Sequence, residues 1–232
     1  MEETALLSIR NVSNVYISRA YSLFGKKEIK NVLKNINLEI KKGEIFGLTG
    51  VSGCGKTTLA RCILSLIDYD GEILLNGQKH EKRSGQIQMV FQEPGASLNP
   101  VKKIGWLMEE PLVIHKIGSQ AERRDKVDEM LERVGLDPSY KTRFVSELSG
   151  GQKQRACIAR ALILEPRLLI ADEAISSLDV SAGAQILNLF RELHENHELD
   201  VLFISHNRDA VEYLCDRIAV MDEGMIKDSI LR

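Results

Sequence analysis

The stretch EIFGLTGVSGCGKTT, residues 44–58, joins a short apolar run to a glycine-rich loop and a Lys-Thr-Thr sequence. The run Glu44–Thr49 predicts a strand, and apolar residues at helical spacing predict a helix from Lys56 to about Ile67. Between them, Gly50–Thr57 satisfies the pattern G-x-x-x-x-G-K-[ST] in the strand–loop–helix context that the pattern requires. This stretch therefore predicts a phosphate-binding loop at the end of a strand.

The chemistry of that loop follows from its residue types. Glycines let successive backbone N–H groups point inward at phosphate oxygens, and the helix N-terminus adds partial positive charge. Lys56 is expected to reach the β- and γ-phosphates, and the Thr57 hydroxyl to ligate Mg²⁺. The residues predicted to bind the nucleotide here are Gly50, Val51, Ser52, Gly53, Cys54, Gly55, Lys56, Thr57 and Thr58.

A second apolar run, Leu168–Ala171, leads directly into Asp172 and Glu173. A buried strand would carry both acids to its carboxyl end, where ligands bind in parallel sheets. We expect Asp172 to hold Mg²⁺ and Glu173 to polarise an attacking water as general base. Two adjacent acids after a strand are common, so they indicate a nucleotide site only in combination with the loop at residues 50–57.

The hydrophobic pattern changes along the chain. Alternating apolar residues in Leu7–Ile9 and Ile36–Ile40 predict antiparallel strands. Residues 94–160 are helical and strand-poor, and AERRDKVDEMLERVG is their clearest amphipathic helix. Elsewhere strands alternate with helices, which favours a parallel sheet covered on both faces. The later elements are expected as a helix from about 152 to 165, a strand at 201–205, a helix at 180–195 and a hairpin at 217–230.

Composition is that of an ordinary globular protein. The 232 residues include 31 Lys and Arg against 33 Asp and Glu, a net charge of −2 that predicts no nucleic-acid partner. No apolar run approaches the roughly 18 residues that cross a bilayer, and MEETALLSIR has no signal-peptide pattern. The four cysteines are scattered, which is typical of reduced thiols, and His194 and His197 are expected to be solvated. These features predict a soluble cytosolic chain.

Leu148-Ser149-Gly150-Gly151-Gln152 resembles the signature motif of the ATP-binding cassette (ABC) ATPases, and nearly the whole chain follows the order of that family. A serine and two glycine amides that open a helix make a second anion-binding site without a lysine. The resemblance implies a head-to-tail dimer, with each ATP between the Lys56 loop of one subunit and the Ser149 helix of the other. It also implies an α/β fold, namely a P-loop NTPase (RecA-like) core with an N-terminal antiparallel β-subdomain and an inserted α-helical subdomain.

The same resemblance implies roles for four further residues. Gln92 matches the glutamine that contacts Mg²⁺ and the attacking water, and Asp179 lies in the loop that crosses the dimer interface. His206 matches the histidine that contacts the γ-phosphate. Tyr16 matches the aromatic residue that stacks on adenine, although Tyr21 or Phe24 could serve instead.

A finer resemblance is to the peptide and nickel importer ATPases. It lies in MVFQEP at residues 89–94, in SLNP at 97–100 and in the segment DVS followed by QILNL between 179 and 189. It implies ATP and Mg²⁺ as cofactors, two transmembrane permease subunits, a second ATPase subunit (a paralogue or a second copy) and an extracytoplasmic substrate-binding protein. The chain would then act at the cytoplasmic face of the membrane. The resemblance implies that the chain energises uptake of peptides or of nickel or other metal chelates. Ala174 after the acidic pair and the end of the sequence at Arg232 point toward a nickel or other metal chelate, and the choice between the two cargoes stays open.

We expect one ABC ATPase domain, with residues 1–93 and 161–232 forming the nucleotide-binding core and 94–160 the signature-motif subdomain. The helical segment and the Gln92 loop are expected to form the docking face for the permease, and Trp106 to be a core residue. The alternative is a soluble, non-transport ABC ATPase of DNA repair or translation, which would typically carry two cassettes, long insertions or basic arms. A binding module without activity is disfavoured because Lys56, Asp172, Glu173 and His206 are all present.

Overall fold

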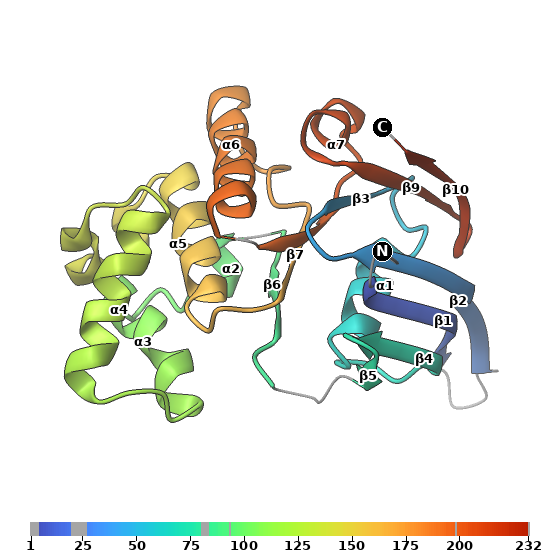
Figure 1. Ribbon diagram of the computed structural model, residues 1–232, viewed down its shortest axis with the longest axis horizontal. Helices are drawn as coiled ribbons and strands as arrows, with labels where there is room; N and C mark the ends of the chain where they lie inside the picture. The colour runs from blue at the N-terminus through green and yellow to red at the C-terminus, as the bar shows by residue number, and fades with distance from the viewer. Residues whose placement is uncertain (1–4, 20–26, 80–83, 93, 198, 232) are drawn as a thin grey trace. The chain divides into compact units, whose positions relative to one another are not determined.

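The computed structural model describes residues 5–19, 27–79, 84–92, 94–197 and 199–231 (Figure 1). Packing contacts divide the chain into two compact units, which we describe separately. The sheet unit comprises residues 1–84 and 202–232, and the helical unit comprises residues 85–201. These divisions fall at other positions than the expected subdomain boundaries at 94 and 160, which remain a prediction.

The sheet unit contains a four-stranded antiparallel sheet. Strand β1 (Ala5–Arg19) pairs with β2 (Lys27–Lys41) on one side and with β4 (Asp70–Leu75) on the other (Figure 1). The short strand β5 (Gln78–Lys79) extends the sheet beyond β4. Leu7 lies opposite Ile40 and Ile9 opposite Leu38, which confirms the predicted antiparallel pairing.

The same unit contains the strand that leads into the glycine-rich loop. Strand β3 (Ile45–Thr49) is parallel to β9 (Arg217–Asp222), which forms the predicted hairpin with β10 (Met225–Leu231). Helix α7 (Arg208–Leu214) packs against β3 so closely that a Cβ on Gly47 would lie 2.7 Å from Val211. Helix α1 (Lys56–Ile63) is shorter than predicted, because the backbone turns into the left-handed region at Ser65.

The helical unit has a pair of parallel strands and a group of packed helices (Figure 1). Strands β6 (Ile87–Val90) and β7 (Leu168–Asp172) are parallel, as predicted. Helices α3 (Ile104–Ile114), α4 (Gln120–Arg133) and α5 (Gly150–Leu162) pack on one another. The other elements are α2 (Pro94–Ser97), the 3-10 turns η1 (Pro138–Thr142) and η2 (Val145–Glu147), and α6 (Val180–His197). Strand β8 (Asp200–Ile204) crosses the boundary between the two units.

The predicted apolar face of α4 is confirmed, because Val127, Met130, Leu131 and Val134 are all buried. Its N-terminus is held by a capping box in which the Ser119 hydroxyl accepts from the Glu122 N–H and the Glu122 carboxylate accepts from the Ser119 N–H. Hydrogen bonds from the backbone N–H and the side chain of Ser119 lower the pKa of the Glu122 carboxyl group. In the part of the chain that the structure describes, no helix is long and apolar enough to span a membrane.

Two predictions about single residues are wrong. Trp106 is not a core residue, since 44% of its surface is exposed and the Lys102 ammonium lies 4.5 Å from its ring centroid. The buried face of α3 is instead formed by Ile104, Leu107, Met108 and Leu112. His194 is partly buried, with its Nδ1 atom 2.8 Å from the carbonyl oxygen of Leu199, and so is not simply solvated.

Candidate functional site

The glycine-rich loop between β3 and α1 surrounds a buried cation. The side chain of Lys56 donates hydrogen bonds to the carbonyl oxygens of Gly50 at 2.8 Å and of Val51 at 3.0 Å, and the residue is 6% exposed. Thr57 and Thr58, at the start of α1, are partly buried. The loop therefore holds one positive charge beside the first N–H groups of a helix, where an anion is stabilised.

The path of this loop requires glycine at its first position. Gly50 has φ of +153°, and a Cβ placed there would lie 2.1 Å from the carbonyl oxygen of Met221. Further along, the Cys54 carbonyl accepts a hydrogen bond from the Gly224 N–H at 3.0 Å. Contacts with the β9–β10 hairpin thus fix the loop before any ligand binds.

Two other predicted residues lie in the sheet unit. His206 lies two residues after the end of β8 and is exposed, next to the buried Ser205. Asn207 then caps α7, because its side-chain oxygen accepts from the Ala210 N–H at 3.1 Å. Tyr16 lies on β1 with 65% of its surface exposed, so its ring is available for stacking. The alternatives Tyr21 and Phe24 lie outside the described residues.

The acidic pair lies at the carboxyl end of β7 in the helical unit, as predicted. Asp172 ends the strand and is 4% exposed. Glu173 has φ of +52°, in the left-handed region that a glutamate rarely adopts. Its carbonyl accepts hydrogen bonds from the N–H of Ser176 at 3.1 Å and from the hydroxyl of Ser176 at 2.9 Å. Strained backbone of this kind is concentrated at functional sites, because the surrounding structure must hold it.

The predicted signature residues form the N-terminus of α5. Ser149 is the N-cap: its hydroxyl accepts from the Gln152 N–H at 3.3 Å, and its own N–H donates to the Gln152 side-chain oxygen at 2.9 Å. This capping box starts the helix at Gly150, two residues before the predicted position. Gly150 and Gly151 therefore contribute the first N–H groups of the helix.

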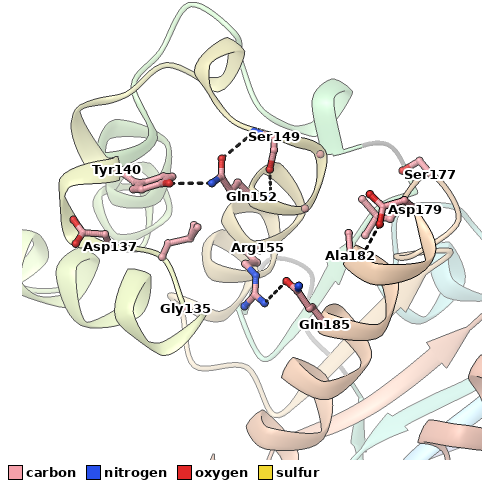
Figure 2. A pocket seen from close by; sticks show the side chains of 14 residues that line it. Gly135, Asp137, Tyr140, Ser149, Gln152, Arg155, Ser177, Asp179, Ala182 and Gln185 are labelled. Carbon is pink, nitrogen blue, oxygen red and sulfur yellow. Dashed lines mark hydrogen bonds between the residues drawn. The ribbon is translucent and has the colours of Figure 1, made fainter.

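These residues line a pocket of about 480 Å³ within the helical unit (Figure 2). One side is formed by Ser149–Gln152, and another by residues 177–179 in the loop before α6. In that loop Asp179 is exposed and caps α6, because its carboxylate accepts from the Ala182 N–H at 2.8 Å. The structure thus brings the predicted signature residues and Asp179 to the same pocket.

Arg155 and Tyr140 also line this pocket, and neither was among the predicted site residues. Arg155 donates to the Val134 carbonyl at 2.6 Å and lies near the Gln185 side chain, so it ties α5 to the end of α4 (Figure 2). Tyr140, in η1, accepts a hydrogen bond from the Gln152 side chain at 2.9 Å. The preceding Asp137 marks that turn, and hydrogen bonds from Ser139 together with the charge of Arg143 lower its pKa. The Asp-Pro pair at 137–138 is the local signal that could have indicated this turn.

Gln92 follows β6 in the helical unit and is exposed. The predicted magnesium ligands are therefore distributed, with Thr57 in the sheet unit and both Gln92 and Asp172 in the helical unit. Among the residues that the structure describes, no cluster of three or more His, Cys, Asp or Glu side chains could hold a metal by itself. A buried carboxylate with hydroxyl and amide oxygens suits Mg²⁺, which commonly takes one or two protein ligands together with phosphate oxygens.

Known proteins resemble this chain over most of its length. Residues 33–176 match the family model described as ABC transporter. The oligopeptide transport ATP-binding protein AppF of Bacillus subtilis is 42% identical over 97% of this chain and 72% of its own length. The dipeptide transport ATP-binding protein DppF of Haemophilus influenzae is 41% identical over 96% of this chain and 71% of its own length.

Among solved structures, the ATP-binding cassette MJ0796 in a dimeric post-hydrolysis state bound to ADP and Pi has a TM-score of 0.81 and 29% identity. That alignment covers 97% of this chain and 98% of the cassette.

Proposed function

Because the chain belongs to the ABC transporter family and is an ATPase cassette of that family, we propose that it energises the import of peptides by hydrolysing ATP between two cassettes. The observation that carries this proposal is the presence of two different anion-binding helix N-termini in one chain. One is the Lys56 loop at α1, and the other is the Ser149 cap at α5. In the dimer we propose, the Lys56 loop of each cassette and the Ser149 cap of the other enclose one nucleotide.

The residues of this chain divide the work on the nucleotide. The N–H groups of Gly50–Thr58 and the Lys56 ammonium hold the phosphates, and Tyr16 stacks on adenine. Asp172, Thr57 and Gln92 hold Mg²⁺, which when bound neutralises charge that develops on the phosphate oxygens. The nucleotide site of the second cassette is completed by the signature residues and by Asp179, which reaches across the interface. These signature residues are Ser149, Gly150, Gly151 and Gln152.

Glu173 is the general base of the proposed reaction. Its carboxylate takes a proton from the attacking water, while His206 donates a hydrogen bond toward the γ-phosphate. The place of Glu173 directly after Asp172, at the carboxyl end of β7, supports this role. Gln92 also orients the water. Its exposed position after β6 suits a residue that links the nucleotide site to a docked partner.

The partners we propose are two transmembrane permease subunits, a second cassette that is a paralogue or a copy of this chain, and an extracytoplasmic binding protein. Exposed large apolar side chains in the helical unit support docking to the permease. Among the described residues from 91 to 160, which we define as the docking surface, they are Phe91, Val101, Trp106, Val113, Ile114, Ile117 and Phe144. The complex would place this chain at the cytoplasmic face of the membrane.

The cargo we propose is a peptide. AppF and DppF are named for oligopeptide and dipeptide transport, and neither is named for nickel. The preference for nickel that Ala174 suggested has no support among these relatives.

The direct test is uptake into vesicles that contain the complete transporter, with Mg-ATP supplied on the side of the cassettes. We expect a labelled di- or oligopeptide to accumulate with ATP but not with ADP, and nickel complexes to be left outside. ATP-dependent uptake of nickel without peptide uptake would contradict the proposed cargo. If the rate of ATP hydrolysis changed neither when cargo was added nor when the permease was present, that result would contradict the proposed role in import.

The variant Trp106→Glu tests the docking surface in the same vesicles. A carboxylate at this exposed position should weaken an apolar interface and reduce peptide uptake by about tenfold or more. Leu66→Glu, at an exposed position of the sheet unit, is the matched control and should leave uptake unchanged. Full uptake by the Trp106 variant would remove this residue from the interface.

A further inference from the structure

Tyr140 lies beside the signature residues although it precedes Gln152 by 12 positions. Its hydroxyl oxygen accepts a hydrogen bond from the Gln152 side-chain nitrogen at 2.9 Å, and the two side chains point toward one another (Figure 2). Both residues line the pocket next to Ser149. The contact therefore joins the turn η1 to the first turn of α5.

This contact holds the side-chain nitrogen of Gln152, the residue that completes the capping box of α5. The Gln152 side-chain oxygen accepts from the Ser149 N–H at 2.9 Å, while its nitrogen donates to Tyr140. The amide is therefore held at both ends: the Ser149 N–H, which can only donate, requires the amide oxygen, and the Tyr140 hydroxyl holds the amide nitrogen. Tyr140 thus restrains the Gln152 side chain in the conformation that contacts the backbone of Ser149.

Tyr140 is itself held firmly. Its N–H donates to the Asp137 carbonyl at 2.9 Å, and the Arg143 guanidinium carbon lies 3.9 Å from its ring centroid. The Asp137 carboxylate in turn accepts from the Ser139 N–H at 2.8 Å. A side chain anchored at its backbone and at its ring can hold another group in place at little entropic cost.

We propose that Tyr140 is a positioning residue of the ATPase, which acts through Gln152 to hold Ser149 and the first turn of α5 ready for the nucleotide of the second cassette. This inference rests on the proposed function. A preorganised site loses less conformational entropy when it binds, so its affinity is higher. Loss of the hydroxyl should therefore weaken the ATP-driven association of the cassettes and leave the chemistry at Glu173 unchanged.

The test compares the steady-state kinetics of wild-type protein with those of Tyr140→Phe, which removes the hydroxyl and keeps the ring. Loss of one neutral hydrogen bond should raise KM for Mg-ATP by about threefold to tenfold. Both kcat and Tm should stay close to the wild-type values. Tyr213→Phe, which removes a hydroxyl from α7 in the sheet unit, is the matched control and should change neither KM nor kcat.

A double-mutant cycle with Gln152→Ala shows whether Tyr140 acts through Gln152. In the Gln152→Ala background, Tyr140→Phe should have almost no further effect on KM, because the two residues form one unit. An equal increase of KM in both backgrounds would overturn the inference. So would wild-type kinetics in Tyr140→Phe, or a lower Tm that accounts for the lost activity.

Hydrogen exchange separates this inference from the proposed function. In the chain without nucleotide, the Ser149 N–H should exchange several-fold faster in Tyr140→Phe than in the wild type, since its acceptor is less firmly held. Unchanged exchange would overturn the positioning role alone. Absence of hydrolysis by wild-type protein would overturn the proposed function, and the nucleotide role of Tyr140 with it.

Discussion

Lys56 is the residue in which burial and charge conflict most clearly. A buried ammonium group is costly unless it is hydrogen-bonded, and here the carbonyl oxygens of Gly50 and Val51 accept hydrogen bonds from it. These partners belong to the same loop, so a phosphate can replace them as the acceptor without any change of fold. The loop thus holds the Lys56 ammonium group in a position where it can bind an anionic ligand.

Replacement Lys56→Ala should therefore weaken binding of Mg-ATP by at least about tenfold, since charge-assisted hydrogen bonds to phosphate are lost. Equilibrium titration with a fluorescent ATP analogue measures this effect. Lys42→Ala, which removes a lysine from the exposed turn before β3, is the control and should bind normally. Wild-type affinity and hydrolysis in Lys56→Ala would refute the role of this loop.

Single residues with a local signal were predictable, and residues whose role depends on packing were not. The spacing around Lys56 and the serine before Gly150 can be read from adjacent positions. The contact between Tyr140 and Gln152 could not be predicted, because it needs the path of the chain through η1 and η2. Trp106 was assigned to the core on residue type alone, yet the other side of α3 has enough aliphatic residues to form the buried face.

At the scale of elements, the strand-to-loop junction after β3 is the feature that the sequence constrains most. Gly50→Ala should destabilise the sheet unit by about 2 to 4 kcal/mol, because the new methyl group would overlap the Met221 carbonyl. Urea denaturation measures the loss. The control Gly183→Ala in α6 places its methyl in ordinary contact, 3.9 Å from Ile175, and should stabilise the protein by up to about 1 kcal/mol. Equal stability of the two variants would contradict the close approach at Gly50.

Element types were predicted better than element ends. The alternation of apolar residues in β1 and β2, and the periodicity of α4, each reflect a buried face, and burial confirms both. Helix ends depend on single backbone conformations and caps. Helix α1 ends early before the left-handed Ser65, and α5 starts early because Ser149 caps it. The residues at which a helix begins and ends can therefore be located only when the hydrogen bonds of its termini are known.

At the scale of the whole molecule, the chain consists of two compact units that carry different parts of the proposed site. The Lys56 loop, Tyr16 and His206 belong to the sheet unit, whereas the acidic pair and the signature residues belong to the helical unit. Order along the sequence therefore does not show how the parts assemble on a nucleotide. A requirement for a second cassette follows from the chemistry of the two helix N-termini, and it remains our proposal.

The measurement that tests this account most directly is the mass in solution of Glu173→Gln with Mg-ATP and with Mg-ADP. Without the general base, bound ATP should persist, so the variant should form a dimer in ATP and remain a monomer in ADP. Its hydrolysis should be at least about a hundredfold slower than that of Glu192→Gln, a control at an exposed position of α6. A Glu173→Gln protein that stays monomeric in Mg-ATP, or that hydrolyses ATP at the wild-type rate, would contradict the account.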